Sequence, residues 1–293
     1  MEEIAKEQKK PEWIRVRMPS GDTWKQVHLS LAKNGLHTVC DEAQCPNKGE
    51  CWGQGTATFM IMGDICTRSC RFCAVHSARE GRPLRADEGE ALALSAGELG
   101  LKYLVLTSVD RDDLPDRGAG HYASCIAAVK RKIPGIKVEA LTPDYTEAEL
   151  SVIAPASPHV LAHNVETVRS LQHVRDRRAG FDSSLETLRA AKRLGLRLTK
   201  SSLLLGLGEN PGEVLSAMDE LRAAEVDILV LGQYLRPSAR QIPVAAYIHP
   251  DEFARYAEEA RKRGFKSVIS APLARTSYHA GEGHAEAEGG LAD

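Results

Sequence analysis

Short runs of apolar and β-branched residues alternate with amphipathic stretches from about residue 58 onward. Such runs predict strands, and the stretches with helical periodicity between them predict helices. Strands are expected at residues 58–62, 103–108, 137–142, 160–164, 196–204, 228–234 and 267–270. Strands that alternate with helices indicate a parallel sheet joined by right-handed crossovers.

Several helical stretches carry their own boundary signals. One is expected at residues 87–99, just before a glycine that stops it. Asn210 and Pro211 have the residue types of an N-cap and a first helical position. Another helix is expected to begin at Pro250 and to end at Gly264.

The length of the repeating region favours a partial barrel. A complete (β/α)8 barrel takes about 250 residues, or roughly 31 per unit. Residues 58–270 hold about six such units once a long loop is subtracted. The expected fold is therefore α/β, a partial (β/α)6 TIM-like barrel. A doubly wound parallel sheet is the competing architecture, because periodicity alone does not distinguish the two.

The two ends of the chain differ in composition from the repeating region. Residues 1–57 are polar and are expected to form an irregular N-terminal extension. Residues 58–270 are expected to form the barrel, and residues 271–293 a short C-terminal segment. The part of that segment after Ala280 is rich in Gly, Ala and Glu and is expected to be disordered.

Composition excludes several functional classes. The chain has 293 residues, a formal charge of −2 and 27% charged residues. A near-neutral balance argues against a dedicated nucleic-acid binder. No run approaches the ~18 apolar residues of a membrane helix, and residues 1–10 are too charged for a secretory signal. The expected location is the cytoplasm.

The cysteines are unusually clustered, since six of the seven lie between positions 40 and 73. In a small secreted protein this would indicate disulfides. In a large chain without a signal sequence, clustered cysteines more often bind a metal or a cluster. They form two groups, a first triplet (Cys40, Cys45 and Cys51) and a second triplet (Cys66, Cys70 and Cys73).

The second triplet has the spacing C-x3-C-x2-C and follows the first predicted strand, at the end where such barrels place their chemistry. Three thiolates can hold three irons of a [4Fe–4S] cluster, which usually takes four cysteines. The remaining iron can then chelate the amino and carboxylate groups of S-adenosylmethionine (SAM). The alternative is a zinc site with His76 as the fourth ligand.

This spacing, with an aromatic residue before its last cysteine, resembles the radical SAM signature. The resemblance places Phe72 near the adenine of SAM, and the alternative is a residue that only packs the loop. The stretch 40–52, with the spacing C-x4-C-x5-C, resembles the auxiliary-cluster segment of the lipoyl synthase family. Further matching segments, in the same order, are residues 55–60, 107–114, 163–167, 206–209, 232–234 and 275–280.

The resemblance covers about residues 35–280 and implies a second [4Fe–4S] cluster. Its ligands would be the first triplet and Ser277, so that Ser277 joins the cysteines as a catalytic residue. The family usually has Arg-Ser-Ser-Tyr at this point, whereas here the first of the two serines is replaced by Thr276. The serine directly before Tyr278 is present, and the implied ligand is kept.

The resemblance also implies contacts to SAM. It points Asn164 and Glu166 at the ribose or methionine part, although both also fit a solvated loop. Lys200 is expected either to meet the SAM carboxylate or to be a snorkelling or ion-paired lysine. Gly206 belongs to a segment that would line the nucleoside, although a lone G-x-G is weak evidence.

Two further features have competing interpretations. The charge run at residues 110–113 either lines the substrate entrance or forms a solvated loop. Cys125 lies on the apolar face of a predicted helix and is expected to be a core thiol.

The activity implied by the resemblance is the insertion of two sulfur atoms, at C6 and C8 of an octanoyl chain. The implied cofactors are SAM and two [4Fe–4S] clusters, one of which is consumed as the sulfur donor. The octanoyl chain would be attached to a lysine of a lipoyl carrier domain, such as the glycine-cleavage H protein or a 2-oxoacid dehydrogenase E2 subunit. Other implied partners are flavodoxin or ferredoxin and a cluster-delivery protein, but neither nucleic acid nor a membrane.

Two other functions remain open at this point. A different radical SAM sulfur-inserting enzyme, acting on a tRNA base or on dethiobiotin, shares the same chemical logic. Such an enzyme would lack the combination of the first triplet with the terminal Ser-Tyr pair. A zinc-binding interaction module is the second alternative.

Overall fold

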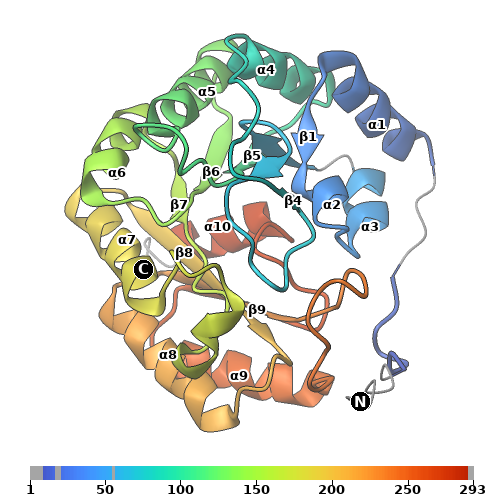
Figure 1. The fold of residues 1–293 in the computed structure, drawn as a ribbon, viewed down its shortest axis with the longest axis vertical. Coiled ribbons are helices and arrows are strands. Elements are labelled where there is room, and N and C mark those ends of the chain that lie inside the picture. Colours follow the sequence, from blue (N-terminus) through green and yellow to red (C-terminus); the bar gives the residue numbers. More distant parts are fainter. Residues whose placement is uncertain (1–8, 17–20, 55–56, 290–293) are drawn as a thin grey trace.

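The computed structural model describes residues 9–16, 21–54 and 57–289 (Figure 1). Residues 1–8, 17–20, 55–56 and 290–293 lie outside the described residues. The expectations of an irregular start and a disordered end are therefore not tested for these residues. In the described part of the chain, no helix is both long and apolar enough to cross a membrane.

The main sheet has eight strands in the described residues, and neighbours in space follow the order of the sequence. From one edge to the other they are β1 (His37–Thr38), β2 (Thr58–Ile61), β5 (Tyr103–Ser108), β6 (Lys137–Leu141), β7 (Val160–Ala162), β8 (Leu198–Leu205), β9 (Ile228–Gln233) and β10 (Ser267–Ser270). All pairs are parallel except the antiparallel pair of β1 and β2. A doubly wound sheet reverses its strand order part-way, so that architecture is excluded.

Six helices connect the parallel strands and cover their outer face. They are α4 (Glu88–Glu98), α5 (Ala119–Lys132), α6 (Glu147–Ile153), α7 (Phe181–Arg193), α8 (Pro211–Ala223) and α9 (Pro250–Lys262). Figure 1 shows them as an outer arc around the strands. With β10 as a closing seventh parallel strand, the predicted (β/α)6 partial barrel is confirmed. The edges β1 and β10 do not pair, so the barrel is open.

The helix boundary signals act as expected. The Asn210 side chain accepts a hydrogen bond from the backbone N–H of Glu213 at 3.1 Å and caps α8, which begins at Pro211. In α9, Phe253 and Tyr256 point into the core with at most 5% of their surface exposed. Gly264 follows α9 at a φ of 83°, a left-handed conformation that ends helices readily in glycine.

The N-terminal extension is more regular than expected. It contains α1 (Asp22–Asn34), α2 (Val39–Glu42) and α3 (Lys48–Gly53). Val27 and Leu31 are four residues apart in α1, so they lie on one face and are buried in the core with Trp52. The expectation of an irregular extension is therefore wrong for these residues. A helix with only a narrow apolar stripe is stable here because the stripe packs against the barrel.

The C-terminal segment ends in a helix, α10 (Ala280–Gly289), where disorder was expected. Ala287 packs with Val160, Leu198 and Ile228, which are the first residues of β7, β8 and β9. Helix α10 thus covers the amino ends of the strands. Its small residues permit this close approach, because a Cβ added to Gly283 would lie 3.0 Å from Ile269.

Candidate functional site

The loop of the second triplet begins where β2 ends. The backbone leaves the strand through two residues with positive φ, Met62 at 67° and Gly63 at 87°. Two short strands, β3 (Ile65–Cys66) and β4 (His76–Ser77), pair in parallel at the base of the loop. The loop therefore stands at the carboxyl end of the first barrel strand, as the sequence predicts.

Backbone N–H groups point at the sulfur atoms of this loop. The amide of Arg68 donates to Cys66 Sγ at 3.4 Å, and the amide of Asp176 donates to Cys70 Sγ at 3.2 Å. A turn joins the last two cysteines, with the Cys73 amide donating to the Cys70 carbonyl at 3.1 Å. Hydrogen bonds to sulfur are one of the means by which proteins tune iron–sulfur clusters.

Arg68 braces the loop from inside the second triplet. Its side chain is 6% exposed and forms ion pairs with Asp112 at 2.9 Å, Asp144 at 2.8 Å and Asp110 at 3.4 Å. Asp176 accepts a hydrogen bond from the backbone amide of Ser69 at 3.0 Å. Within the charge run at 110–113, Asp110 and Asp112 thus fix the cysteine loop to the barrel, while the exposed Asp113 pairs with Arg111.

The first triplet lies on two short helices beside the β1–β2 edge. Cys40 is in α2 and Cys51 is in α3, with Cys45 in the turn between them. The Cys45 amide donates to the Cys40 carbonyl at 3.1 Å, and the Cys51 amide donates to the Asn47 carbonyl at 2.9 Å. The buried indole nitrogen of Trp52 has no hydrogen-bond partner among the described residues and lies beside the Cys40 thiol.

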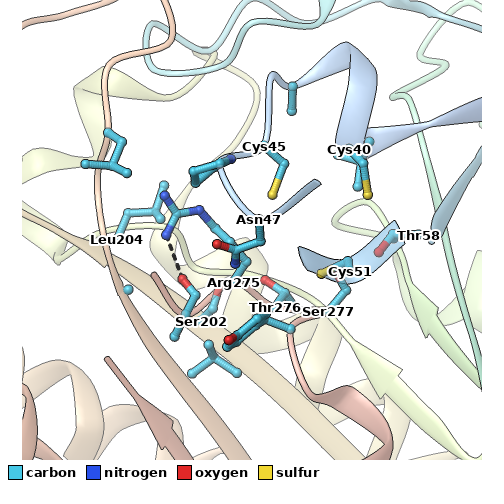
Figure 2. A pocket seen from close by; sticks show the side chains of 18 of the residues that line it. Cys40, Cys45, Asn47, Cys51, Thr58, Ser202, Leu204, Arg275, Thr276 and Ser277 are labelled. Atoms are coloured by element: carbon cyan, nitrogen blue, oxygen red, sulfur yellow. Dashed lines mark hydrogen bonds between the residues drawn. The ribbon is translucent and has the colours of Figure 1, made fainter. Parts of the chain in front are cut away.

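The segment after β10 is tied to the first triplet although it is more than 200 residues away. Asn47 Nδ2 donates to the Leu273 carbonyl at 2.6 Å, and Tyr278 Oη donates to Glu50 Oε1 at 3.0 Å. These bonds bridge the two open edges of the barrel. They bring Ser277 to the same wall as the three cysteines, as Figure 2 shows.

A second set of bonds ties the same segment to the barrel. Thr276 Oγ1 lies 3.0 Å from Ser202 Oγ and donates to Asn164 Oδ1 at 3.2 Å. The carbonyl of Ala274 packs so closely on Gly232 that a Cβ there would lie 2.0 Å from the oxygen. Ser277 is therefore held between two anchored neighbours.

The two triplets meet at one cavity of about 690 Å³. Its walls include the first triplet, Ser277 and, from the second triplet, Cys73. Phe72, Asn164 and Glu166 also line it, so three of the residues singled out for SAM lie together. Glu166 adopts a φ of 65°, and its Oε1 accepts a hydrogen bond from Asn164 Nδ2 at 3.1 Å.

The cavity extends through the barrel from the cysteine loops towards α10. Apolar strand residues such as Val105, Leu141 and Val230 line its interior. Tyr103, at the start of β5, and Gly281, in α10, line its far end. The cavity therefore has apolar strand residues inside and carries its sulfur groups on the walls nearest the two loops, while Glu282 of α10 also lines it.

Burial strongly raises the pKa values of the cysteine thiols in and beside the cavity. Burial raises the pKa of Cys66 and of Cys70 to about 12, and that of Cys73 and of Cys40 to about 11. Burial also raises the pKa of Cys45. Without a metal the thiols are neutral, so metal binding must displace protons from them. Buried thiols with N–H donors aimed at them fit an iron–sulfur cluster.

The spacing of the sulfurs argues against zinc. In the part of the chain that the structure describes, one group of His, Cys, Asp or Glu side chains is close enough to share a single ion, namely Glu88, His121 and Cys125. Neither cysteine triplet meets that spacing, and His76 is exposed. Zinc requires all its ligands about 2.0–2.3 Å from one ion, whereas a cubane distributes its ligands over separate irons.

Comparison with known proteins agrees with this geometry. The model of the Radical SAM superfamily matches residues 60–221. A curated lipoyl synthase of Methanocella arvoryzae is 53% identical over 277 residues, covering 93% of this chain and 94% of its own length. That of Thermus thermophilus is 50% identical over 276 residues, covering 92% of this chain and 85% of its own.

The chain belongs to the lipoyl synthase family. As a radical SAM enzyme it uses a [4Fe–4S] cluster and SAM. The crystal structure of methylornithine synthase is similar in fold, with a TM-score of 0.57 at 15% identity, covering 83% of this chain and 71% of that one. At such low identity the likeness concerns the barrel alone.

Two residues that the resemblance points at SAM have other contacts in this member of the lipoyl synthase family and do not line the cavity. Lys200 is fully buried, and its Nζ pairs with Glu139 at 2.9 Å, so the ion-paired alternative describes it. Neither Lys200 nor Gly206 lines the cavity. Gly206 serves close packing, since a Cβ there would lie 2.1 Å from Gln233 Nε2 and 2.3 Å from the Ala246 carbonyl.

Cys125 is a core thiol, as predicted, and it is completely buried. Its neighbours already have other partners. Glu88 accepts hydrogen bonds from the Met62 amide at 3.0 Å and from His121 Nε2 at 2.6 Å. This cluster therefore supports the start of the second-triplet loop.

Several residues that shape the site carried no signal in the sequence. Arg68 lies inside the second triplet, but its three carboxylate partners come from two other loops, those after β5 and β6. Asn47 was noted only within the stretch 40–52, and its bond to Leu273 depends on the folded barrel. Arg275 was noted only as part of the C-terminal match, although its side chain lines the cavity.

Proposed function

We propose that the chain inserts two sulfur atoms, at C6 and C8, into an octanoyl group that is amide-linked to a lysine of a lipoyl carrier domain. The similarity to curated lipoyl synthases over nearly the whole chain supports the reaction. The observation that carries the proposal is the shared cavity, which the first triplet, Ser277 and Cys73 line together. One cavity allows two cofactors to reach the same bound alkyl chain.

We assign the SAM-cleaving [4Fe–4S] cluster to Cys66, Cys70 and Cys73. Bound there, it would supply the electron that cleaves SAM, and the carbon radical from SAM would remove hydrogen from unactivated carbons, a step that acid–base groups do not achieve. The protein's part is to fix the loop through Arg68 and its carboxylates. It also surrounds the cysteines with protein, because a buried site excludes the water that would quench a reactive species.

For the adjoining SAM site we propose Phe72, Asn164 and Glu166. The ring of Phe72 offers an apolar surface to a base, and the two oxygens of Glu166 can accept hydrogen bonds from ribose hydroxyls. Burial raises the pKa of Glu166, while Arg175 and the Asn164 amide oppose that change. A polar ligand that donates to this carboxylate would favour its charged form further.

We assign a second [4Fe–4S] cluster to Cys40, Cys45, Cys51 and Ser277. It would supply the sulfur that is transferred. The protein holds Ser277 beside the three cysteines through the bonds of Asn47 to Leu273 and of Tyr278 to Glu50. Serine oxygen is a harder donor than thiolate and suits such a cluster less well, which fits a cluster that must be opened.

The proposed substrate matches the shape and polarity of the cavity. Its apolar interior suits an alkyl chain, and cationic side chains at its lining, Lys10 and Arg236, suit contacts with a charged carrier. We propose the glycine-cleavage H protein or a 2-oxoacid dehydrogenase E2 subunit as the carrier. Flavodoxin or ferredoxin would supply electrons, and a delivery protein would rebuild the second cluster.

The alternative functions are less well supported. Another sulfur-inserting radical SAM enzyme would share the second triplet but would lack the combination of the first triplet with Ser277. A zinc-binding module does not fit sulfurs that are too far apart to share one ion.

The test separates the two clusters by mutation. Replacing Cys40, Cys45 and Cys51 by Ala should lower the iron content of the anaerobically reconstituted protein from about eight to about four per chain. This variant should still cleave SAM but form no sulfur-containing peptide. Replacing Cys66, Cys70 and Cys73 by Ala should abolish SAM cleavage and also leave about four irons.

Cys125→Ala is the matched control, because Cys125 is a buried cysteine away from the cavity. It should keep both clusters and both activities. A fully loaded wild-type protein that stops at about four irons would reject the second site. Lipoyl formation by the variant without the first triplet would reject its role as sulfur source.

A further inference from the structure

Arg275 is a partly buried cation in the lining of the cavity. Its Nη1 donates to the carbonyl of Ala274 at 2.6 Å, and it forms no ion pair with any of the described residues. The buried Arg68 and Arg111 are ion-paired, Arg68 with three carboxylates and Arg111 with Asp113 at 2.8 Å, whereas the buried Arg175 donates to neutral oxygens, among them Ser184 Oγ at 2.9 Å. Withdrawing a charge from water without a partner is costly, so the position of Arg275, which is partly buried and not ion-paired among the described residues, favours an anionic partner.

The surroundings of Arg275 indicate where that partner binds. The side chain lines the cavity, and Figure 2 draws it among Cys45, Asn47 and Ser277. Burial lowers the pKa of Arg275, whereas a thiolate at Cys45 and the carboxylate of Glu166 would raise it. Arg275 in turn lowers the pKa of Cys45, so it lies within electrostatic reach of the first triplet as well as of Glu166.

The backbone fixes this position. Ala274 packs on Gly232, and the Thr276 hydroxyl bonds to Asn164. Arg275 lies between these anchors, two residues before the proposed ligand Ser277. The backbone that carries the Arg275 side chain is therefore fixed relative to Ser277.

A cluster bound by the first triplet and Ser277 would be negatively charged, because four anionic ligands outweigh the charge of the cubane core. Placing such an anion in a protein interior is favourable only if charge and hydrogen bonds compensate it. A guanidinium offers a permanent positive charge and five N–H donors. Net charge and hydrogen bonds to sulfur are the two levers that set the reduction potential of a cluster.

We propose that Arg275 is a positioning residue for the second cluster, which it holds by charge and N–H donation without ligating iron, and whose reduction potential it raises. This rests on the proposed function, since it requires a cluster at Cys40, Cys45 and Cys51. The effect is selective, because the Cys66, Cys70 and Cys73 loop has its own cation, Arg68, which its carboxylates already neutralise.

The experiment uses a background in which Cys66, Cys70 and Cys73 are replaced by Ala, so that one cluster remains. The reduction potential of that cluster is followed by electron paramagnetic resonance in a redox titration. Arg275→Gln should shift the potential to more negative values and speed the loss of iron to a chelator. Arg275→Lys keeps the charge and should lie closer to the parent than Arg275→Gln does.

Arg236→Gln is the matched control. It also removes a guanidinium from the cavity lining, but that group donates to the carbonyls of Gln241 at 2.8 Å and Ala239 at 2.7 Å. It should leave the potential near that of the parent. An unchanged potential in Arg275→Gln, or an equal shift in Arg275→Lys, would overturn the role of Arg275 alone. A parent without any cluster would overturn the proposed cluster site itself.

Discussion

Ser277 differs from the cysteines of the first triplet in the hardness of its donor atom. The sequence alone placed it far from them, and its role came from the resemblance. The structure brings it to the same cavity through bonds of its neighbours, Thr276 and Tyr278. Individual contacts of this kind were not predictable, because Asn47 and Leu273 are joined only once the barrel has brought its two edges together.

Ser277→Cys tests whether a hard ligand is needed. Thiolate binds iron more firmly than a serine oxygen does, so the variant should keep both clusters and still cleave SAM. It should yield little or no lipoyl product from an octanoyl-lysine peptide, as measured by mass spectrometry. Thr276→Ser, which restores the usual family residue and keeps a hydroxyl, serves as the control and should remain active. Full product formation by Ser277→Cys would show that the weak ligand is not part of the mechanism.

At the scale of elements, the sequence predicted the barrel well and the two ends poorly. The βα units were visible because each strand and helix of the barrel has its own period and boundary residues, such as Asn210 before α8. The end of the chain has few large apolar residues, and so α10 was not expected. The helix is stabilised because its small residues pack closely against the first residues of the strands. That fit depends on the shape of the barrel and is not visible in the sequence of the helix.

Helix α10 allows a direct test of that contact. Ala287 is completely buried against the starts of β7, β8 and β9, whereas Ala285 on the same helix is exposed. Ala287→Asp should destabilise the folded protein by at least about 2 kcal/mol, because it buries an unpaired charge. Ala285→Asp should change stability by less than about 0.5 kcal/mol. Anaerobic urea unfolding of both variants measures the difference, and equal midpoints would mean that α10 does not pack on the barrel in solution.

At the scale of the whole molecule, the cavity joins parts of the chain that are distant in sequence. The N-terminal extension, the second-triplet loop and the segment after β10 each contribute a wall. The loop positions followed from the order of strands, since carboxyl ends of parallel strands gather at one end of a barrel. The bridging of the open side did not follow, because nothing in the local pattern relates residue 47 to residue 273.

The long apolar cavity predicts how the substrate is presented. An octanoyl chain on a lysine tether can extend into the apolar interior while the carrier stays outside. Free octanoate lacks the tether and the carrier, and it would also place a charged carboxylate in an apolar environment, which is costly. It should therefore be a very poor substrate compared with an octanoyl-lysine peptide under the same conditions. Product analysis by liquid chromatography measures both rates, and comparable turnover would count against this account.

The central claim is that a cluster held by the first triplet and Ser277 supplies the inserted sulfur. The most direct test is a single turnover with protein whose clusters have been reconstituted with a heavy sulfur isotope. The protein is freed of loose sulfide and given SAM, a reductant and an octanoyl-lysine peptide. The account predicts that the lipoyl peptide carries the heavy isotope at both inserted positions, as seen by mass spectrometry. Lipoyl peptide that contains only ordinary sulfur would contradict it.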